Sequence, residues 1–133
     1  MGNAVSVGSH SIIEHHVVIG DGVRIHSNVF IPEYSELEDD CWIGPNAVFT
    51  NARFPRSCGV KETLKGPRVR RHAKIGANVT LLPNVEIGAD ALVGAGSVVI
   101  HDVPAGAVVV GNPARVVKTI SDIAAYRASG SRQ

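Results

Sequence analysis

Aromatic residues are scarce in this sequence: three Phe, two Tyr and one Trp make up 5% of its 133 residues. Because aromatic side chains supply much of the bulk of broad cores, their scarcity favours a narrow interior. Cysteine is also rare, and its context predicts a buried packing residue at Cys41 and an incidental loop thiol at Cys58. We therefore expect neither a disulfide bond nor a metal site built on cysteine.

The chain also lacks a marked charge of either sign. Thirteen Lys and Arg residues stand against twelve Asp and Glu, and only the stretch 53–71 is locally basic. Nucleic-acid binding would need a basic face. No apolar stretch approaches the roughly 20 residues of a membrane-spanning helix, and no charged start precedes an apolar core as in a secretion signal. The composition predicts a cytoplasmic protein that binds neither nucleic acid nor membrane.

What the sequence does contain is an aliphatic residue at every sixth position. The first run is Val7, Ile13, Ile19, Ile25, Ile31, Leu37 and Ile43, and the second is Val69, Ile75, Leu81, Ile87, Val93 and Val99. Four residues after each of these lies a small or β-branched residue, such as Val23, Cys41, Ala73 or Ser97. The repeat has no exception in either run.

A period of six is three times the strand period of two and no multiple of the helical 3.6. The aliphatic residues therefore point to one side of short extended segments, which are separated by turn residues such as Gly20-Asp21 and Gly44-Pro45-Asn46. Three hexapeptides per coil describe a triangular prism of parallel strands, in which each coil packs on its neighbours. We predict a single all-β domain over 1–133, a parallel β-helix of a little over four coils.

The repeat is interrupted once. After Phe49 the phase is lost, and it resumes at Val69 with a shift of two residues. An out-of-phase segment cannot continue the core, so we predict a protruding loop over about 51–68 that builds a site; a tolerated insertion is the alternative. After Val103 the chain leaves the repeat, and the composition of 119–128 predicts a short C-terminal amphipathic helix.

The hexads, the single loop and the exit segment together resemble the hexapeptide-repeat acyltransferases, whose fold is a left-handed parallel β-helix. The most specific element is the run from Gly111-Asn112-Pro113 to Lys118, which is similar to the coenzyme A segment of that family. Stretches 43–51, 54–56 and 75–80 look most like the N-acetyltransferases of nucleotide-linked 3-amino sugars. The resemblance implies an acetyl-CoA-dependent N-acetyltransferase acting on an amino group of a nucleotide-linked amino sugar. It also implies a homotrimer with its active site and coenzyme groove between adjacent prisms.

Small side chains favour a coenzyme site. Residues eighteen apart should stack, which places Gly76 under Gly94 and Ala77 under Ala95, and a further step of eighteen reaches Asn112 and Pro113. The narrow pantetheine arm needs exposed backbone groups without bulky side chains in the way. The alternative is that Gly and Ala are simply good corner residues. We predict that acetyl-CoA is bound by Gly76, Ala77, Gly94, Ala95, Asn112, Pro113, Ala114, Arg115 and Lys118, the last two basic residues facing the phosphates.

The acceptor group is predicted from the loop. In the hydroxyl-acetylating members of the family a loop histidine before a proline is the general base, and here Phe54 precedes Pro55. Loss of a general base would cost a hydroxyl acceptor roughly 10²- to 10⁴-fold in rate, whereas about a tenth of a sugar amine is neutral at pH 7. The sequence therefore favours N-acylation. The resemblance assigns Asn51 as the catalytic residue that orients the amine, and we expect Arg53, Phe54 and Arg56 to bind the acceptor.

Six histidines are present, and each is more readily explained as a solvated or interface residue than as a catalyst. We retain His16 and His72 as catalytic candidates that bind the acceptor or accept a proton across a subunit interface. Three other functions remain open. They are an O-acetyltransferase of a sugar or small molecule, a non-catalytic scaffold, and a zinc protein like the γ-type carbonic anhydrases.

The zinc alternative would need three convergent imidazoles, for which His10, His15 and His26 are a conceivable source. The γ-type enzymes lack the Gly-Asn-Pro-Ala exit and the mid-chain loop, so we expect no metal. Apolar residues also occupy outward hexad positions, namely Val18, Phe30, Trp42 and Val48. A solenoid with such outward residues is expected to be a homotrimer.

Overall fold

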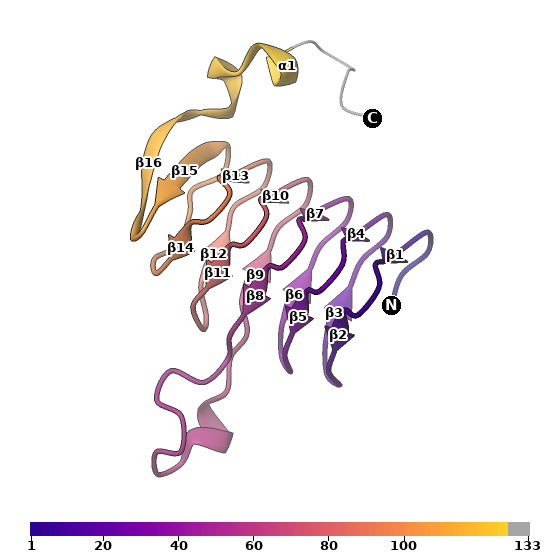
Figure 1. Ribbon diagram of the computed structural model, residues 1–133, viewed down its shortest axis with the longest axis vertical. Coiled ribbons are helices and arrows are strands. Elements are labelled where there is room, and N and C mark those ends of the chain that lie inside the picture. Colours follow the sequence, from indigo (N-terminus) through magenta and orange to yellow (C-terminus); the bar gives the residue numbers. More distant parts are fainter. Residues whose placement is uncertain (128–133) are drawn as a thin grey trace.

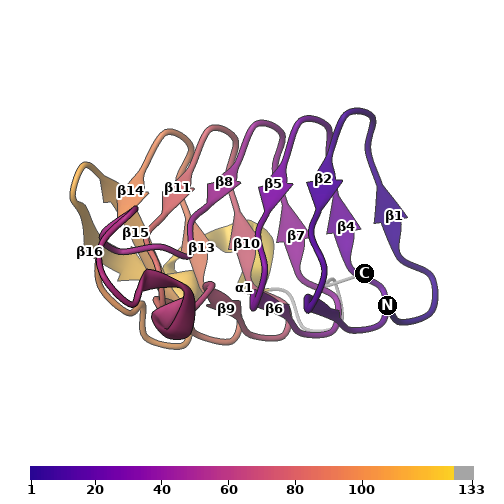
Figure 2. The same ribbon diagram turned by 90° about the horizontal axis from the view of Figure 1, so that it is seen from below.

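The computed structural model describes residues 1–127 and forms a left-handed parallel β-helix, as predicted (Figures 1 and 2). Three ladders of strands run along the faces of a triangular prism. Sheet A contains β1 (Ser6–Val7), β4 (Arg24–Ile25), β7 (Trp42–Ile43), β10 (Lys74–Ile75), β13 (Leu92–Val93), β15 (Ala107–Gly111) and β16 (Ala114–Thr119). Sheet B contains β2 (Ile12–Ile13), β5 (Phe30–Ile31), β8 (Val48–Phe49), β11 (Thr80–Leu81) and β14 (Val98–Val99). Sheet C contains β3 (Val18–Ile19), β6 (Glu36–Leu37), β9 (Arg68–Val69) and β12 (Glu86–Ile87).

The core consists of the two inward positions of each hexad. The aliphatic position is buried from Ile19 through Val99, and the small position four residues later is buried from Val23 through Val103. Phe49 also fills an inward position, so the repeat continues to the very start of the loop and makes fourteen two-residue strands in all. Val7 is 42% exposed because no described coil lies beneath the first one.

Turns between the sheets form three edges along the prism, each named by the two sheets that it joins. Most of the candidate functional side chains lie on these edges. The AB edge comprises 8–11, 26–29, 44–47, 76–79 and 94–97. The BC edge comprises 14–17, 32–35, 50–67, 82–85 and 100–102. The CA edge comprises 20–23, 38–41, 70–73, 88–91 and 104–106.

Most turns contain a residue with positive φ. Where that residue is not glycine it is mostly Asn, Asp or His, the types that enter the left-handed region most readily. His10, His16 and His72 occupy this position, with φ of 63°, 58° and 61°. The left-handed backbone of the turn therefore explains why histidine is found at these three positions, whether or not the side chains take part in a reaction.

The predicted loop is confirmed. Residues 50–67 leave the prism at the BC edge and project beyond it, with a single turn of 3₁₀ helix, η1 (Val60–Thr63) (Figure 1). At the stem the backbone N–H of Lys65 donates to the carbonyl of Asn51 at 3.1 Å. The insertion is thereby closed at its base, and Val69 re-enters the core in register with Leu37.

The predicted C-terminal helix is too long. Residues up to Thr119 belong to an antiparallel hairpin of β15 and β16, because Thr119 pairs with Ala107. The helical part is a 3₁₀ turn, η2 (Ile120–Asp122), followed by α1 (Ala124–Arg127), and residue 128 lies outside the described part. This arm returns over the outer face of sheet A, where the Tyr126 ring lies 4.7 Å from Lys74 Nζ (Figures 1 and 2). No helix within 1–127 is long and apolar enough to cross a membrane.

Candidate functional site

The predicted column of small residues lies on the AB edge. Lys74 pairs with Leu92 and Ile75 with Val93, so Gly76 lies under Gly94. A Cβ on Gly76 would come within 2.7 Å of the Ala95 nitrogen. Close stacking of the coils therefore requires glycine at position 76 whatever the function. Ala95 itself is exposed on this edge, above the Gly76–Ala77 turn.

The exit segment continues this column with a different register from the predicted one. Leu92 pairs with Val108 and Val93 with Val109, a step of sixteen residues and not eighteen. Val110 follows Val109 beyond the Gly94 rung, and a Cβ on Gly94 would contact the Val110 side chain at 2.5 Å. Asn112 and Pro113 are thus the turn of the β15–β16 hairpin and not the next rung. The shift arises at the BC edge between Val99 and Val103, because Val99 still pairs with Leu81 at a step of eighteen and Val103 pairs with Ile87 at a step of sixteen.

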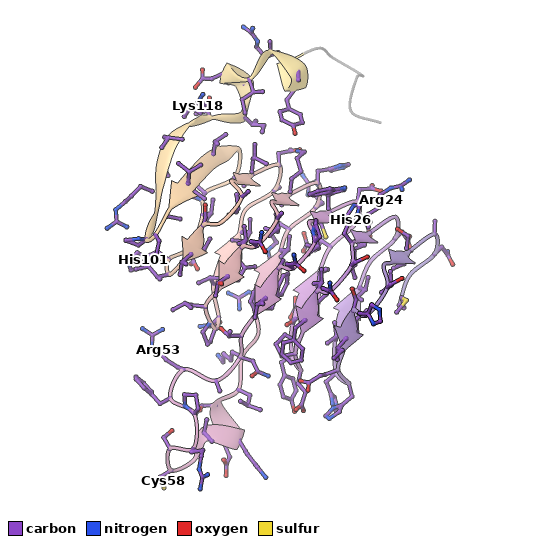
Figure 3. The ribbon with its side chains drawn as sticks, viewed as in Figure 1. Arg24, His26, Arg53, Cys58, His101 and Lys118 are labelled. Atoms are coloured by element: carbon purple, nitrogen blue, oxygen red, sulfur yellow. The ribbon has the colours of Figure 1, made fainter. Side chains whose placement is uncertain are left out.

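Arg115 and Lys118, the predicted phosphate ligands, are separated along β16. Arg115 pairs with Val110 near the AB edge, where the Ser97 hydroxyl accepts the Gly111 N–H at 3.1 Å. Lys118 pairs with Val108 and lies toward the arm (Figure 3). Of these two cations, the hairpin places Arg115 beside the small-residue column.

Asn51 lies on the BC edge in a second column. Its amide nitrogen donates to the carbonyl oxygen of Glu33 at 3.1 Å, and the Glu33 N–H donates to the Glu14 carboxylate at 3.1 Å. Below Asn51, the Glu33 carboxylate lies 3.3 Å from His15 Nε2. Since the amide nitrogen of Asn51 is engaged, its carbonyl oxygen is the group that can accept a hydrogen bond from a ligand.

Glu33 was not among the residues predicted from the sequence, and His15 was named only as a zinc ligand of the carbonic anhydrase alternative. The signal was present, because 15, 33 and 51 are eighteen apart and must stack on one edge. His16, which was predicted, joins the same cluster: its Nδ1 lies 2.6 Å from His15 Nδ1, and its ring stacks on Tyr34 at 5.4 Å between centroids. At that distance one ring can donate its Nδ1–H to the Nδ1 atom of the other. The three groups form a chain from carboxylate to His15 to His16.

The same chain contains the donor types of a metal site. His15, His16 and Glu33 offer ligand atoms within 4.8 Å of one another, and both histidines are exposed. The zinc alternative considered His10, His15 and His26 instead, and the fold places these three histidines apart within one chain. His10 and His26 lie on the AB edge, where the His26 ring packs on Trp42 with centroids 4.6 Å apart, whereas His15 lies on the BC edge.

His72 is not brought to Asn51 within one chain. It lies on the CA edge, with Nε2 4.0 Å from an Asp40 carboxylate oxygen. A groove of about 610 Å³ runs there between the outer face of sheet A and the C-terminal arm, with Trp42 and Tyr126 among its lining residues. Any joint action of His72 and Asn51 would require two subunits.

Of the predicted acceptor-binding residues, the loop brings two together and separates the third. Arg53 and Phe54 line a groove of about 570 Å³ between the loop and the last coils, and the Arg53 guanidinium lies 5.9 Å from the Phe54 ring centroid. His101 lies in the same groove, on the same side of the molecule as Arg53 (Figure 3). Arg56 lines a separate hollow within the loop itself.

The two cysteines are placed as predicted. Burial raises the pKa of the Cys41 thiol to about 12, so this side chain is a packing residue and not a nucleophile. Cys58 is exposed near the tip of the loop (Figure 3). Both are free thiols.

The outer faces of the prism differ in character. The four apolar outward residues that predicted a trimer do not share one face, because Val18 lies on sheet C and Trp42 on sheet A. Sheet B alone is apolar or β-branched along its whole outer row, which consists of Ile12, Phe30, Val48, Thr80 and Val98. Ile12 is 57% exposed and Val48 is 40% exposed. Sheet B is flanked by the small-residue column on one side and the Asn51 column on the other.

Comparison with known proteins identifies the same six-residue repeat. The family model described as "Bacterial transferase hexapeptide (six repeats)" matches residues 1–33 and 66–101. A serine acetyltransferase from Buchnera aphidicola is 33% identical over 120 residues. That match covers 89% of this chain and 38% of the relative, so the chain spans well under half of that protein.

Two solved structures are similar in fold. A hexapeptide-repeat acetyltransferase from Vibrio cholerae, complexed with acetyl coenzyme A, has a TM-score of 0.78 and 28% identity, covering 90% of this chain and 69% of that one. A variant of perosamine N-acetyltransferase from Caulobacter crescentus, in complex with CoA and GDP-perosamine, has a TM-score of 0.71 and 25% identity. It covers 88% of this chain and 53% of that one.

Proposed function

Because the chain belongs to the bacterial transferase hexapeptide family, we propose that it is an acetyl-CoA-dependent N-acetyltransferase whose acceptor is an amino group of a nucleotide-linked amino sugar. The observation that carries the proposal is the placement of two unlike edges beside one apolar face. The AB edge offers a column of small residues, and the BC edge offers Asn51 with the Glu33–His15–His16 chain. The first suits a long thin donor, and the second suits an acceptor that must lose a proton.

The AB edge is the proposed coenzyme groove. Gly76, Ala77, Gly94 and Ala95 carry no side chain larger than a methyl group, so an extended pantetheine arm can lie along this edge. Arg115 is the cation placed to meet a phosphate of the coenzyme. The similarity of fold to an acetyltransferase complexed with acetyl coenzyme A supports the identity of the donor.

The BC edge is the proposed acceptor site. The Asn51 carbonyl oxygen can accept a hydrogen bond from the amine and hold its lone pair toward the acetyl carbon. The exposed His16 imidazole can accept the proton that the amine loses, since His15 and the Glu33 carboxylate stabilise the positive charge that results. Attack of the amine on the acetyl carbon forms the C–N bond and breaks the C–S bond, and the coenzyme A thiolate that leaves takes up a proton. His72 takes part only if a second subunit brings its CA edge close, so we assign it no role in this step.

An O-acetyltransferase is the second candidate, and the histidine chain is the observation that favours it. A hydroxyl acceptor requires a general base, and His16 can serve as one through its contact with the His15–Glu33 pair, although the loop provides Phe54. The second candidate is also consistent with the name of one relative, a serine acetyltransferase. Two acceptors that differ solely in bearing an amine or a hydroxyl at one carbon separate the candidates.

The test compares turnover of those two acceptors by the parent and by Asn51→Ala. We expect the amine to react faster, and Asn51→Ala to lower kcat by about 10²-fold with little change in coenzyme affinity, because one oriented hydrogen bond at the reacting centre is lost. His10→Asn is the matched control, since it keeps a residue that tolerates positive φ on the other edge and should leave kcat unchanged. A hydroxyl acceptor that reacts as fast as the amine would replace the proposal by the second candidate.

A further inference from the structure

The groove beside the loop contains more than the two predicted acceptor contacts. We call it the loop groove. Its walls are the stem of the loop on one side and the turns of the last two coils on the other. The residues that the argument uses are Arg53, Phe54, Lys65, Asn84, His101 and Asp102. Its volume of about 570 Å³ is in the range of small-molecule sites.

Positive charge is concentrated in the stretch 53–71, which contributes two cations to this groove, in a chain that is otherwise acidic. Seven of the thirteen Lys and Arg residues lie within 53–71, together with one acidic residue, Glu62. Two of the seven are neutralised on sheet C, where Arg68 and Arg70 form ion pairs with glutamates. Arg53 and Lys65 are exposed in the loop groove, and neither forms an ion pair with another residue of the described chain.

The opposite wall adds an oriented donor. Asn84 holds a left-handed turn conformation, with φ of 64°, and its Oδ1 accepts a hydrogen bond from Arg68 Nη1 at 2.7 Å. That bond fixes the amide so that its NH₂ group is the part left for a ligand. Lys65 is tied to the same turn, because the Asn84 N–H donates to the Lys65 carbonyl at 3.1 Å. A cation and an amide donor are thus held on adjoining backbone.

One acidic group lies in the groove. Asp102 accepts the Glu86 N–H through Oδ1 at 2.8 Å, which explains its presence as a turn residue. Arg53, Lys65 and Asp102 together carry one net positive charge. The exposed Phe54 ring, 67% accessible, supplies a flat apolar surface next to the cations.

We propose that the loop groove is a diphosphate-binding subsite, with Arg53 and Lys65 pairing the phosphates and the Asn84 amide donating to a phosphate oxygen. The chemistry fits because phosphates are bound by cations combined with fixed N–H donors. This inference rests on the proposed function, which supplies two sources of the group: the nucleoside diphosphate of the acceptor and the pyrophosphate of coenzyme A. Phe54 beside the cations suits a nucleoside diphosphate whose base stacks on the ring.

Direct binding to the intact protein tests the subsite without any turnover. Calorimetry with inorganic pyrophosphate, uridine diphosphate, thymidine diphosphate and coenzyme A should detect binding of at least pyrophosphate, weakened by added salt. Lys65→Gln should weaken it by about five- to tenfold, since one exposed charge-assisted contact is lost. Lys61→Gln is the matched control, because Lys61 is a lysine of the same loop that lines a different hollow, and it should change nothing.

Two further variants should change the affinity for pyrophosphate in opposite directions. Asn84→Asp keeps a residue that tolerates positive φ and keeps the partner of Arg68, but it replaces the amide donor with a negative charge, so binding should fall by at least tenfold. Asp102→Asn keeps the acceptor for the Glu86 N–H and removes a negative charge, so binding should tighten by about two- to fivefold. A gain of affinity cannot come from damaged folding.

The same measurements distinguish a nucleoside diphosphate of the acceptor from the pyrophosphate of coenzyme A as the ligand of the groove. They also distinguish failure of the subsite from failure of the proposed function. Weaker binding of the nucleoside diphosphates by Lys65→Gln with unchanged coenzyme A affinity assigns the groove to the acceptor, and the reverse assigns it to the coenzyme. Equal affinities of parent, Lys65→Gln and Asn84→Asp for all four probes would overturn the subsite. Absence of acetyl transfer by the parent, with these binding shifts intact, would overturn the proposed function and leave the subsite standing.

Discussion

Ser35 and Ser97 occupy equivalent inward positions of the hexad, and both are fully buried. Within the described residues the Ser35 hydroxyl has no hydrogen-bond partner, whereas the Ser97 hydroxyl donates to the Gly94 carbonyl at 2.7 Å and accepts the Gly111 N–H. Ser35→Ala should therefore raise the free energy of unfolding by about 1 kcal/mol, and Ser97→Ala should lower it by about 1–2 kcal/mol. Chemical denaturation at one fixed protein concentration measures both, and shifts of the same sign would contradict this account.

Single residues also show where sequence reasoning reaches its limit. The inward residues were predictable because a six-residue period fixes which side chains face the core. Among the histidines the sequence selected His16 and His72, which share the left-handed turn position, and passed over His15. Residue type could not rank them, because the property that distinguishes His15 is a carboxylate eighteen residues away on the next coil. The eighteen-residue step that stacks Gly76 under Gly94 also stacks His15 under Glu33.

At the scale of elements, the outer row of sheet C is held by charge. Arg70 forms ion pairs with Glu38 at 2.9 Å and Glu86 at 3.2 Å, and Arg68 approaches Glu86 at 3.7 Å. The hydrogen bond from Arg70, with a Coulombic contribution from Arg70 and Arg68, holds the pKa of Glu86 below its ordinary value. These contacts join three successive rungs of the ladder, β6, β9 and β12.

The sign of the pH dependence follows from that shift. A carboxylate whose pKa is lower in the folded protein stabilises it above the unfolded pKa of about 4.3, and the contribution is lost as the pH falls through the folded value. Thermal midpoints should therefore fall more steeply below pH 5 in the parent than in Glu86→Gln. Because Glu86 is more than a third exposed, the difference should be modest and should shrink in high salt.

Elements outside the repeat were predicted less well than those within it. Periodicity located the strands and the loop, since each depends on local phase. It could not give the step of sixteen between β13 and β15, because the exit has no repeat of its own. Thr119 was assigned to a helix on composition, but pairing with Ala107 keeps it in β16, and tertiary pairing overrides a weak helical preference. The helix begins only at Ala124.

At the scale of the whole molecule, the proposed site needs two subunits. The AB and BC edges flank sheet B, so packing of sheet B faces around a threefold axis would bring the small-residue column of one subunit to the Asn51 column of the next. Within one chain the two columns are separated by the width of that sheet. We therefore expect a homotrimer, with three times the 14.0 kDa chain mass in light scattering.

A mixture of two inactive variants tests the shared site. Ala95→Leu should block the coenzyme column, because the larger side chain would occupy the exposed edge, and Asn51→Ala should remove the acceptor contact. Each homotrimer should be nearly inactive. In randomly mixed trimers about a quarter of the interfaces combine an intact column from one variant with an intact Asn51 edge from the other, so co-expression should restore activity to about that fraction of the parent. Mixing the finished homotrimers without exchange of subunits is the control and should restore nothing. If the co-expressed trimers are no more active than either variant alone, both columns act within one chain and the sheet B interface does not form the site.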